Sequence, residues 1–140
     1  MHPSELILND IKDRLEWSVD DIRGAYWIDK KLDLDDLPCV VVSVDGEDIQ
    51  EYGNHYLVDL SVNLKFLTVD RGFNLGDKKL LNILHDSNLI VKRISDRLQN
   101  IMKVIELSTS DIVDPIDLER SLLTIERVYK ITYRRTRGLV

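Results

Sequence analysis

Carboxylates are the residues with the greatest potential for chemistry in this chain, which has 25 Asp and Glu among its 140 residues. Such groups bind divalent cations or act as general acids and bases. Asp33, Asp35 and Asp36 have the alternate spacing of a calcium-binding loop. The sixth position of that loop would be Pro38 and the twelfth Val44, where glycine and glutamate are required. The sequence therefore excludes an EF-hand.

A second acidic group follows shortly after the first and consists of Asp45, Glu47, Asp48 and Glu51. Exposed carboxylates of this kind are usually solvated, so we expect at most a weak, adventitious Mg²⁺ contact. The 3 histidines are far apart in the sequence, and the 1 cysteine cannot complete a zinc site with them. We expect no metal and no cofactor.

The sequence patterns of nucleophilic and phosphate-binding enzymes are missing. No serine stands in a Gly-x-Ser-x-Gly elbow, and no glycine-rich loop continues into the Lys-Ser/Thr of a P-loop. Cys39 lies in an apolar run, where a cysteine is usually a small buried hydrophobe. A carboxylate pair stays open as an alternative, although nothing selects one pair over another. We therefore predict no catalytic residues and no enzyme.

The composition is that of a globular domain, with 44% hydrophobic and 31% charged residues. A length of 140 residues suits one domain, and we expect residues 1–140 to form a single unit. No run approaches the roughly 18 apolar residues of a membrane span, and no secretory signal opens the chain. The lone cysteine is typical of a reducing compartment. We expect an intracellular protein with no membrane partner.

Charge is unevenly distributed along the chain. Residues 1–55 have 14 acidic and 5 basic residues, a net of −9, whereas residues 56–140 have 11 acidic and 14 basic residues, a net of +3. The total of −6 argues against a protein that coats nucleic acid. In a head-to-tail ring, an acidic surface facing a basic one would favour one orientation. Simple solvation of both halves is the alternative.

Two amphipathic helices are predicted from apolar residues at three- and four-residue spacing. The first has Ser4 as its expected N-cap and a stripe that includes Leu8, Ile11 and Leu15. The second has Asp77 as its expected N-cap and a stripe from Leu80 to Ile101, with Asn88 as the polar member. It is either continuous or kinked near residues 86–88. Arg97 is expected on its solvated side.

Strands are predicted before and after the second helix. A short one covers residues 25–28, and a strand buried on both faces covers residues 39–44. A long acidic hairpin arm then leads to the strictly alternating strand at residues 56–66. Further strands are expected at residues 102–107 and 123–133, joined by a polar connection. The order helix, strands, helix, strands predicts an α+β domain with a mixed or mostly antiparallel sheet, followed by a flexible tail at residues 134–140.

Two short patterns support a resemblance to a known family. The acidic loop Asp33–Leu37 meets Pro38 at the start of an apolar strand, and the last strand ends Tyr129-Lys130-Ile131-Thr132-Tyr133. These patterns and the order of elements over nearly the whole chain resemble the tail terminator proteins of long-tailed phages. In particular, they resemble the minor tail protein U family of lambda-like siphophages.

The resemblance implies a structural protein of the virion tail or neck, assembled in the host cytoplasm. Such proteins form a homohexameric ring on the head-proximal end of the tail tube and stop its polymerisation. Their partners are the tail tube protein and the head-closure or neck protein. DNA passes through the lumen without specific binding, which suits a net-acidic chain.

Candidate residues for subunit-interface or lumen contacts are the two acidic groups and a set of arginines. Arg127 interrupts the apolar stripe of the last strand, so it is paired either at an interface or inside one subunit. The alternatives are a head-closure or head–tail adaptor ring, an adaptor unrelated to virions, and a small Mg²⁺-dependent enzyme. The complete candidate set is Asp33, Asp35, Asp36, Asp45, Glu47, Asp48, Glu51, Arg127, Arg134, Arg135 and Arg137.

Overall fold

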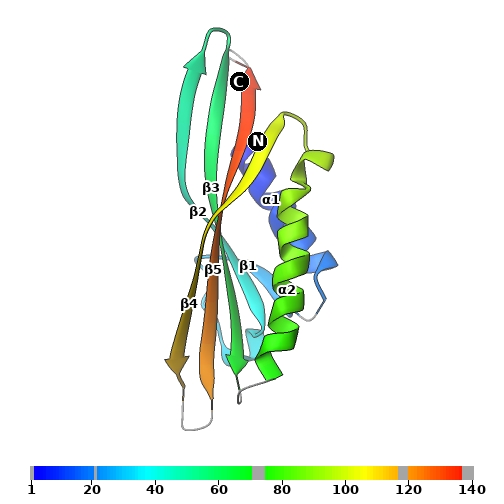
Figure 1. The fold of residues 1–140 in the computed structure, drawn as a ribbon, viewed down its shortest axis with the longest axis vertical. Helices are drawn as coiled ribbons and strands as arrows, with labels where there is room; N and C mark the ends of the chain where they lie inside the picture. Colours follow the sequence, from blue (N-terminus) through cyan, green and yellow to red (C-terminus); the bar gives the residue numbers. More distant parts are fainter. Residues whose placement is uncertain (1, 21, 71–74, 117–119, 137–140) are drawn as a thin grey trace.

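The computed structural model describes residues 2–20, 22–70, 75–116 and 120–136. They form two α-helices and one five-stranded mixed sheet, which confirms the predicted α+β class (Figure 1). Two short 3₁₀-helices lie in the connections. The elements are α1 (Pro3–Ser18), β1 (Gly24–Trp27), η1 (Leu34–Asp36), β2 (Cys39–Tyr52), β3 (His55–Asp70), α2 (Leu75–Lys92), η2 (Ile94–Asp96), β4 (Ile101–Pro115) and β5 (Ser121–Thr136).

The strand order in the sheet is β1-β2-β3-β5-β4. β1 runs parallel to β2, and all other neighbours are antiparallel. β3 and β5 form the centre and are paired from His55–Thr136 at one end to Asp70–Ser121 at the other. The last strand in the sequence therefore lies between two earlier ones.

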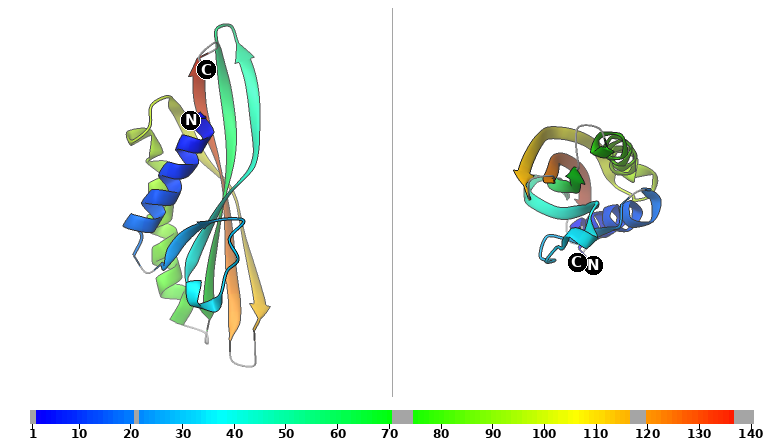
Figure 2. Two further views of the ribbon diagram at one scale, coloured as in Figure 1. Left: turned by 180° about the vertical axis from the view of Figure 1, so that it is seen from behind. Right: turned by 90° about the horizontal axis from the view of Figure 1, so that it is seen from below.

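Both helices lie along the same face of the sheet, and the hydrophobic core fills the space between (Figures 1 and 2). Complete burial of a valine, leucine, isoleucine or phenylalanine side chain stabilises a fold by about 1.5–3 kcal/mol. The alternation predicted for β3 is confirmed, because every second residue from Val58 to Phe66 is buried. The core includes Ile7, Ile11, Leu15, Val58, Leu60, Val62, Leu64, Phe66, Ile83, Leu84, Val91, Tyr129, Ile131 and Tyr133.

The N-terminus of α1 differs from the prediction. The helix begins at Pro3, and His2 is the N-cap, because its Nδ1 accepts a hydrogen bond from the backbone N–H of Ser4 at 3.1 Å. Ser4 lies inside the helix and is 9% exposed. Its hydroxyl is thereby free to contact other elements of the fold, as described below.

α2 is one continuous helix that ends at Lys92, well before Ile101. It begins at Leu75, ahead of the expected cap at Asp77. The apolar positions beyond Lys92 belong to η2 and to the chain leading into β4. The helical spacing of apolar residues therefore continues past the point where the helix ends. Asn88 is polar for a reason: its Oδ1 accepts a hydrogen bond from the Tyr129 hydroxyl at 3.0 Å.

Two of the predicted connections are strand instead. β2 continues to Tyr52 and β4 to Pro115, so the acidic arm and the polar stretch before residue 115 both form sheet. Gly53 has a φ of +57° at the tight turn into β3, and a bulge lies between Val44 and Gly46. Cross-strand hydrogen bonds stabilise these segments although their side chains show no apolar alternation.

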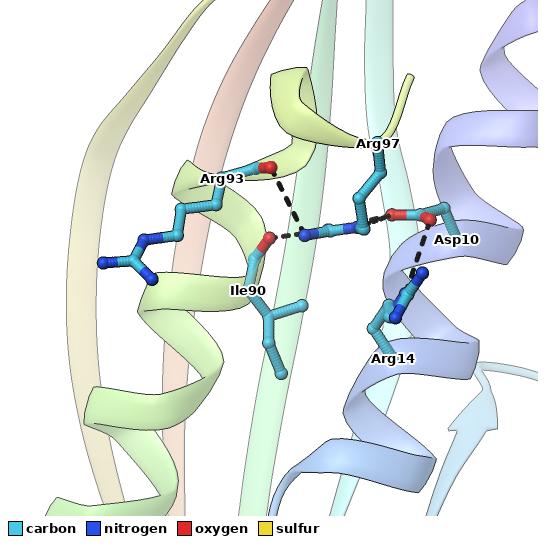
Figure 3. Close-up of polar contacts among 5 residues, drawn as sticks. All are labelled: Asp10, Arg14, Ile90, Arg93 and Arg97. Carbon is cyan, nitrogen blue, oxygen red and sulfur yellow. Dashed lines mark hydrogen bonds and ion pairs between the residues drawn. The ribbon is translucent and has the colours of Figure 1, made fainter.

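The two helices are joined by Arg97, which the sequence placed wrongly on a solvated helix face. Its Nε donates to Asp10 Oδ2 of α1 at 2.9 Å, and its Nη2 donates to the Ile90 carbonyl at 2.7 Å (Figure 3). Arg14 approaches the same carboxylate at 4.0 Å. Hydrogen bonds to charged groups stabilise a fold by about 1.5–3 kcal/mol, so this contact holds the end of α2 against α1.

Candidate functional site

The β2–β3 hairpin from Asp45 to Ser61, which we call the arm, has a continuous run of exposed residues from Asp45 to Asn54. Its far end projects beyond both helices, with the end of β5 beside it (Figure 1). The register places Tyr56 between Glu51 of β2 and Arg135 of β5. Acidic and basic candidate residues therefore lie at the same end of one subunit, on strands separated by β3.

Glu47 contacts the body of its own subunit. Its carboxylate accepts hydrogen bonds from the Ser4 hydroxyl and, at 3.0 Å, from the Tyr133 hydroxyl. The Ser4 and Tyr133 oxygens are 2.7 Å apart, which closes a three-way contact among α1, β2 and β5. Burial raises the pKa of Tyr133, and the hydrogen bond to Glu47 raises it further. This contact attaches the base of the arm to α1.

Asp45 also has a contact inside the subunit. The Asn63 side-chain nitrogen lies 3.4 Å from Asp45 Oδ1 and donates to Glu126 Oε1 at 2.7 Å. Asn63 is 5% exposed, although it lies on the face away from the helices. Asp48 lies opposite Asp59 and is exposed. Asp48 is therefore the arm carboxylate best placed for contact with another molecule.

The first acidic group, Asp33, Asp35 and Asp36, forms hydrogen bonds within its own loop. Asp36 Oδ2 accepts from the Asp33 backbone N–H at 2.9 Å, and the Asp36 backbone N–H donates to the Asp33 carbonyl at 3.1 Å. Asp35 is exposed. This loop precedes the start of β2, whereas the second acidic group lies along the later part of that strand. The two groups are not brought together, and no metal-binding cluster of three ligands occurs in the described part of the chain.

The candidate arginines are divided between the centre and the end of β5. Arg127 Nη1 lies 3.8 Å from Glu106 Oε1 of β4, so the charge is paired inside the subunit. Arg135 Nη1 lies 3.2 Å from His2 Nε2. Arg134 is exposed and belongs to β5, so the predicted tail does not begin at residue 134; Arg137 lies outside the described residues.

Cys39 is 1% exposed at the start of β2, as its apolar neighbours predicted. Burial raises the pKa of its thiol from 9.0 to about 11, and the charge of Asp36 adds to the effect. The thiol is therefore neutral at physiological pH. A neutral, buried thiol is a poor nucleophile.

The outer strand β4 is a surface that the sequence analysis missed. Among the described residues it pairs with β5 on one side and with no strand on the other. It carries five exposed apolar side chains. The first three of these side chains lie in the strand that the sequence predicted at residues 102–107, and the other two lie in the stretch that was interpreted as polar connection. The side chains and their exposed fractions are Met102 59%, Ile105 38%, Leu107 51%, Ile112 50% and Val113 62%.

Comparison with known proteins adds no assignment. The chain matches no protein-family model, and no curated protein matches its sequence. Neither helix in the described part of the chain has the length and apolar character needed to cross a membrane.

Proposed function

We propose that this protein is a structural tail terminator of a long-tailed phage. Its copies form a hexameric ring that caps the head-proximal end of the tail tube, stops polymerisation and provides the surface for head–tail joining. The observation that carries the proposal is a long sheet with an uncovered edge at β4 and a projecting arm at β2–β3. Open strand edges are surfaces on which another chain can dock.

The faces of the sheet support the same proposal. The helices cover one face, and the other carries polar side chains of the central strands, among them Asp59, Lys65 and Lys130. A ring with this face inward has a hydrophilic lumen of mixed charge, through which DNA passes without specific binding. The partners are further copies of the chain, the tail tube protein and a head-closure or neck protein, all within the virion.

Electron microscopy with tail tubes tests the proposal. The concentrated, lightly cross-linked protein is imaged in negative stain alone and after mixing with purified tail tubes. We expect sixfold rings with a central hole, and caps on one end of each tube. Rings that do not bind to the tube ends would instead support a head-closure or adaptor protein. Compact particles in both samples would contradict any ring.

A charge reversal on the arm refines the test. Asp48→Lys reverses an exposed charge of the arm, next to its base at Glu47, and we expect fewer capped tubes. Asp13→Lys reverses an exposed charge on α1 and is the matched control, because α1 lies on the helical side away from the arm's tip. Equal capping by the two variants would exclude Asp48 from the contact.

A further inference from the structure

The sheet has a second open edge, at β1. In the described part of the chain β1 pairs with β2 on one side and with no strand on the other, and β4 forms the opposite edge of the same sheet. A head-to-tail ring needs two different surfaces on each copy, because one surface binds the other on the next copy. The two edges meet this requirement, since every copy has one of each.

The two edges lie at the same level along the strands. Rows of paired residues cross all five strands, and they join Gly24 of β1 to Ile112 of β4 and Trp27 to Thr109. β1 runs antiparallel to β4, because three antiparallel pairings and one parallel pairing separate them. A second copy placed beside β4 without a shift along the strands therefore brings its β1 against residues 109–112 as an antiparallel partner.

This unshifted register also keeps the two faces of the sheet apart. Ala25 packs in the core under the helices, and the same row leads to Asp111 of β4. Residues of one row share a face of the sheet, whereas a slip of one residue would exchange the faces. The helices of neighbouring copies therefore stay on one side, and the polar face proposed to line the lumen continues from copy to copy.

Only the second half of β4 is suited to such a contact. Lysines and bulges protect the edge of a strand from pairing, and Lys103 and two bulges lie in the first half of β4. The pairing of residues 108–115 with β5 is regular, and residues 109–112 fall inside this part. β1 has only 4 residues, so it does not reach the protected half.

Charge is complementary between the two edges. Residues 108–115 have two carboxylates, Asp111 and Asp114, and no basic residue, a net of −2. Residues 22–31 have three basic residues and one acidic residue, a net of +2. In the unshifted register Asp111 lies diagonally across from Arg23 of the next copy, which is exposed and has a side chain long enough for a diagonal contact.

Exposed apolar side chains occur at both edges as well. Trp27 and Ile28 at the end of β1 are 36% and 65% exposed. Ile112 and Val113 of β4 are 50% and 62% exposed. A contact between the edges removes part of this apolar surface from water, which favours association.

We propose that β4 of one copy pairs through residues 109–112 with β1 of the next copy, so that the sheets of neighbouring subunits form one continuous sheet. Main-chain hydrogen bonds between the two strands supply the affinity, as in other strand additions. This pairing rests on the proposed function and deepens it, because it names the two surfaces through which the ring closes. It leaves the arm free to contact the tail tube or the neck protein.

Disulfide cross-linking tests the pairing. Thr109→Cys and Trp27→Cys replace exposed residues that lie opposite each other in this register, whereas the native Cys39 is 1% exposed. Under mild oxidation we expect no dimer from either single variant, covalent dimers from their equimolar mixture, and a ladder ending at the hexamer from the double variant. Thr109→Cys mixed with Ile49→Cys is the matched control. Ile49 is an exposed residue of the arm at another level of the sheet, so no dimer is expected.

The outcomes distinguish the pairing from the proposed function. Rings or capped tubes without a cross-link between positions 109 and 27 would overturn the pairing and leave the tail terminator standing. Dimers from Thr109→Cys alone would also overturn it, since they require a symmetric contact. Cross-linked rings that do not cap tubes would support the pairing and contradict the tail terminator. Protein that forms neither rings nor cross-links would contradict both.

A charge swap checks the register by sedimentation. Arg23→Glu and Asp111→Arg each place like charges across the contact. We expect each to raise the protein concentration needed for half-assembly about tenfold, and the double variant to reverse much of the loss. Lys103→Glu is the matched control on the protected half of β4 and should assemble as the wild type does. Equal losses from Asp111→Arg and Lys103→Glu would overturn the register.

Discussion

β2 and β4 flank the two central strands and have similar lengths, but different surroundings. The first residues of β2 are buried between β1 and β3, and its later part is attached to α1 through Glu47. β4 has β5 on one side and an exposed apolar edge on the other. The covered start of β2 stabilises the fold, whereas the uncovered edge of β4 is available for association. Substitutions in the two strands should therefore have different consequences.

The largest difference is expected for one substitution made in both strands. Val42→Ala in β2 removes buried atoms, since Val42 is 0% exposed, and should lower the free energy of unfolding by about 2.5 kcal/mol. Val113 in β4 is 62% exposed, and Val113→Ala should change it by less than about 0.5 kcal/mol. Urea unfolding of both variants measures the contrast. Equal losses would show that β4 is buried in the monomer.

Alkaline pH should destabilise the start of β2. The pKa of the Cys39 thiol is 9.0 in the unfolded chain and about 11 in the folded protein. Its contribution is complete below pH 9 and is lost as the pH rises through the folded pKa, amounting to about 2 kcal/mol by pH 11. Urea midpoints between pH 8 and 11 measure the loss. Cys39→Ala removes the thiol, so the free energy of unfolding should fall less steeply with pH. Some decline should remain because the tyrosines still titrate. A slope equal to that of the wild type would contradict the prediction.

The contact that attaches the arm should be cooperative. Ser4→Ala and Tyr133→Phe each remove a hydroxyl from the group around Glu47, and each should cost about 1.5 kcal/mol. Because the three groups contact one another, the double variant should lose less than the sum. A double-mutant cycle from urea unfolding gives the coupling. Strict additivity would mean that the hydroxyls act separately.

The smallest effect concerns the turn at the tip of the arm. Gly53 has a φ of +57°, so Gly53→Ala should cost about 1 kcal/mol, whereas Gly53→Asn should cost less because asparagine tolerates this conformation. Thermal unfolding of the two variants gives the order. If alanine and asparagine are equally costly, the left-handed conformation is not the cause.

The sequence predicted regular, buried structure well. The alternation in residues 56–66 identified β3, and the apolar run at residues 39–44 identified the covered half of β2. It failed where long-range pairing decides the structure. The arm and the second half of β4 form strands because β3 and β5 supply hydrogen-bond partners, and polar side chains give no signal of this. Arg97 was misplaced for a related reason: its partners, Asp10 and the Ile90 carbonyl, meet only in the folded chain.

Glu47 was predicted to contact another subunit or the lumen, but in the structure its carboxylate binds Ser4 and Tyr133 of its own subunit. These partners are 43 and 86 residues away in the sequence, so the spacing of charges could not reveal them. The sequence correctly separated the two acidic groups, because it placed the first in the loop before β2 and the second in the hairpin arm. The apolar edge of β4 escaped notice because a bulge interrupts its periodicity.

The central position of β5 has a consequence for synthesis on the ribosome. β5 is made after the other four strands of this sheet, yet it separates β3 from β4. Until residues 121–136 emerge, β3 and β4 each lack a neighbour, and the sheet cannot close. Unpaired strands of this kind in a nascent chain favour aggregation. Folding of this sheet therefore has to wait until residues 121–136 have been made, and truncation before β5 should yield insoluble material.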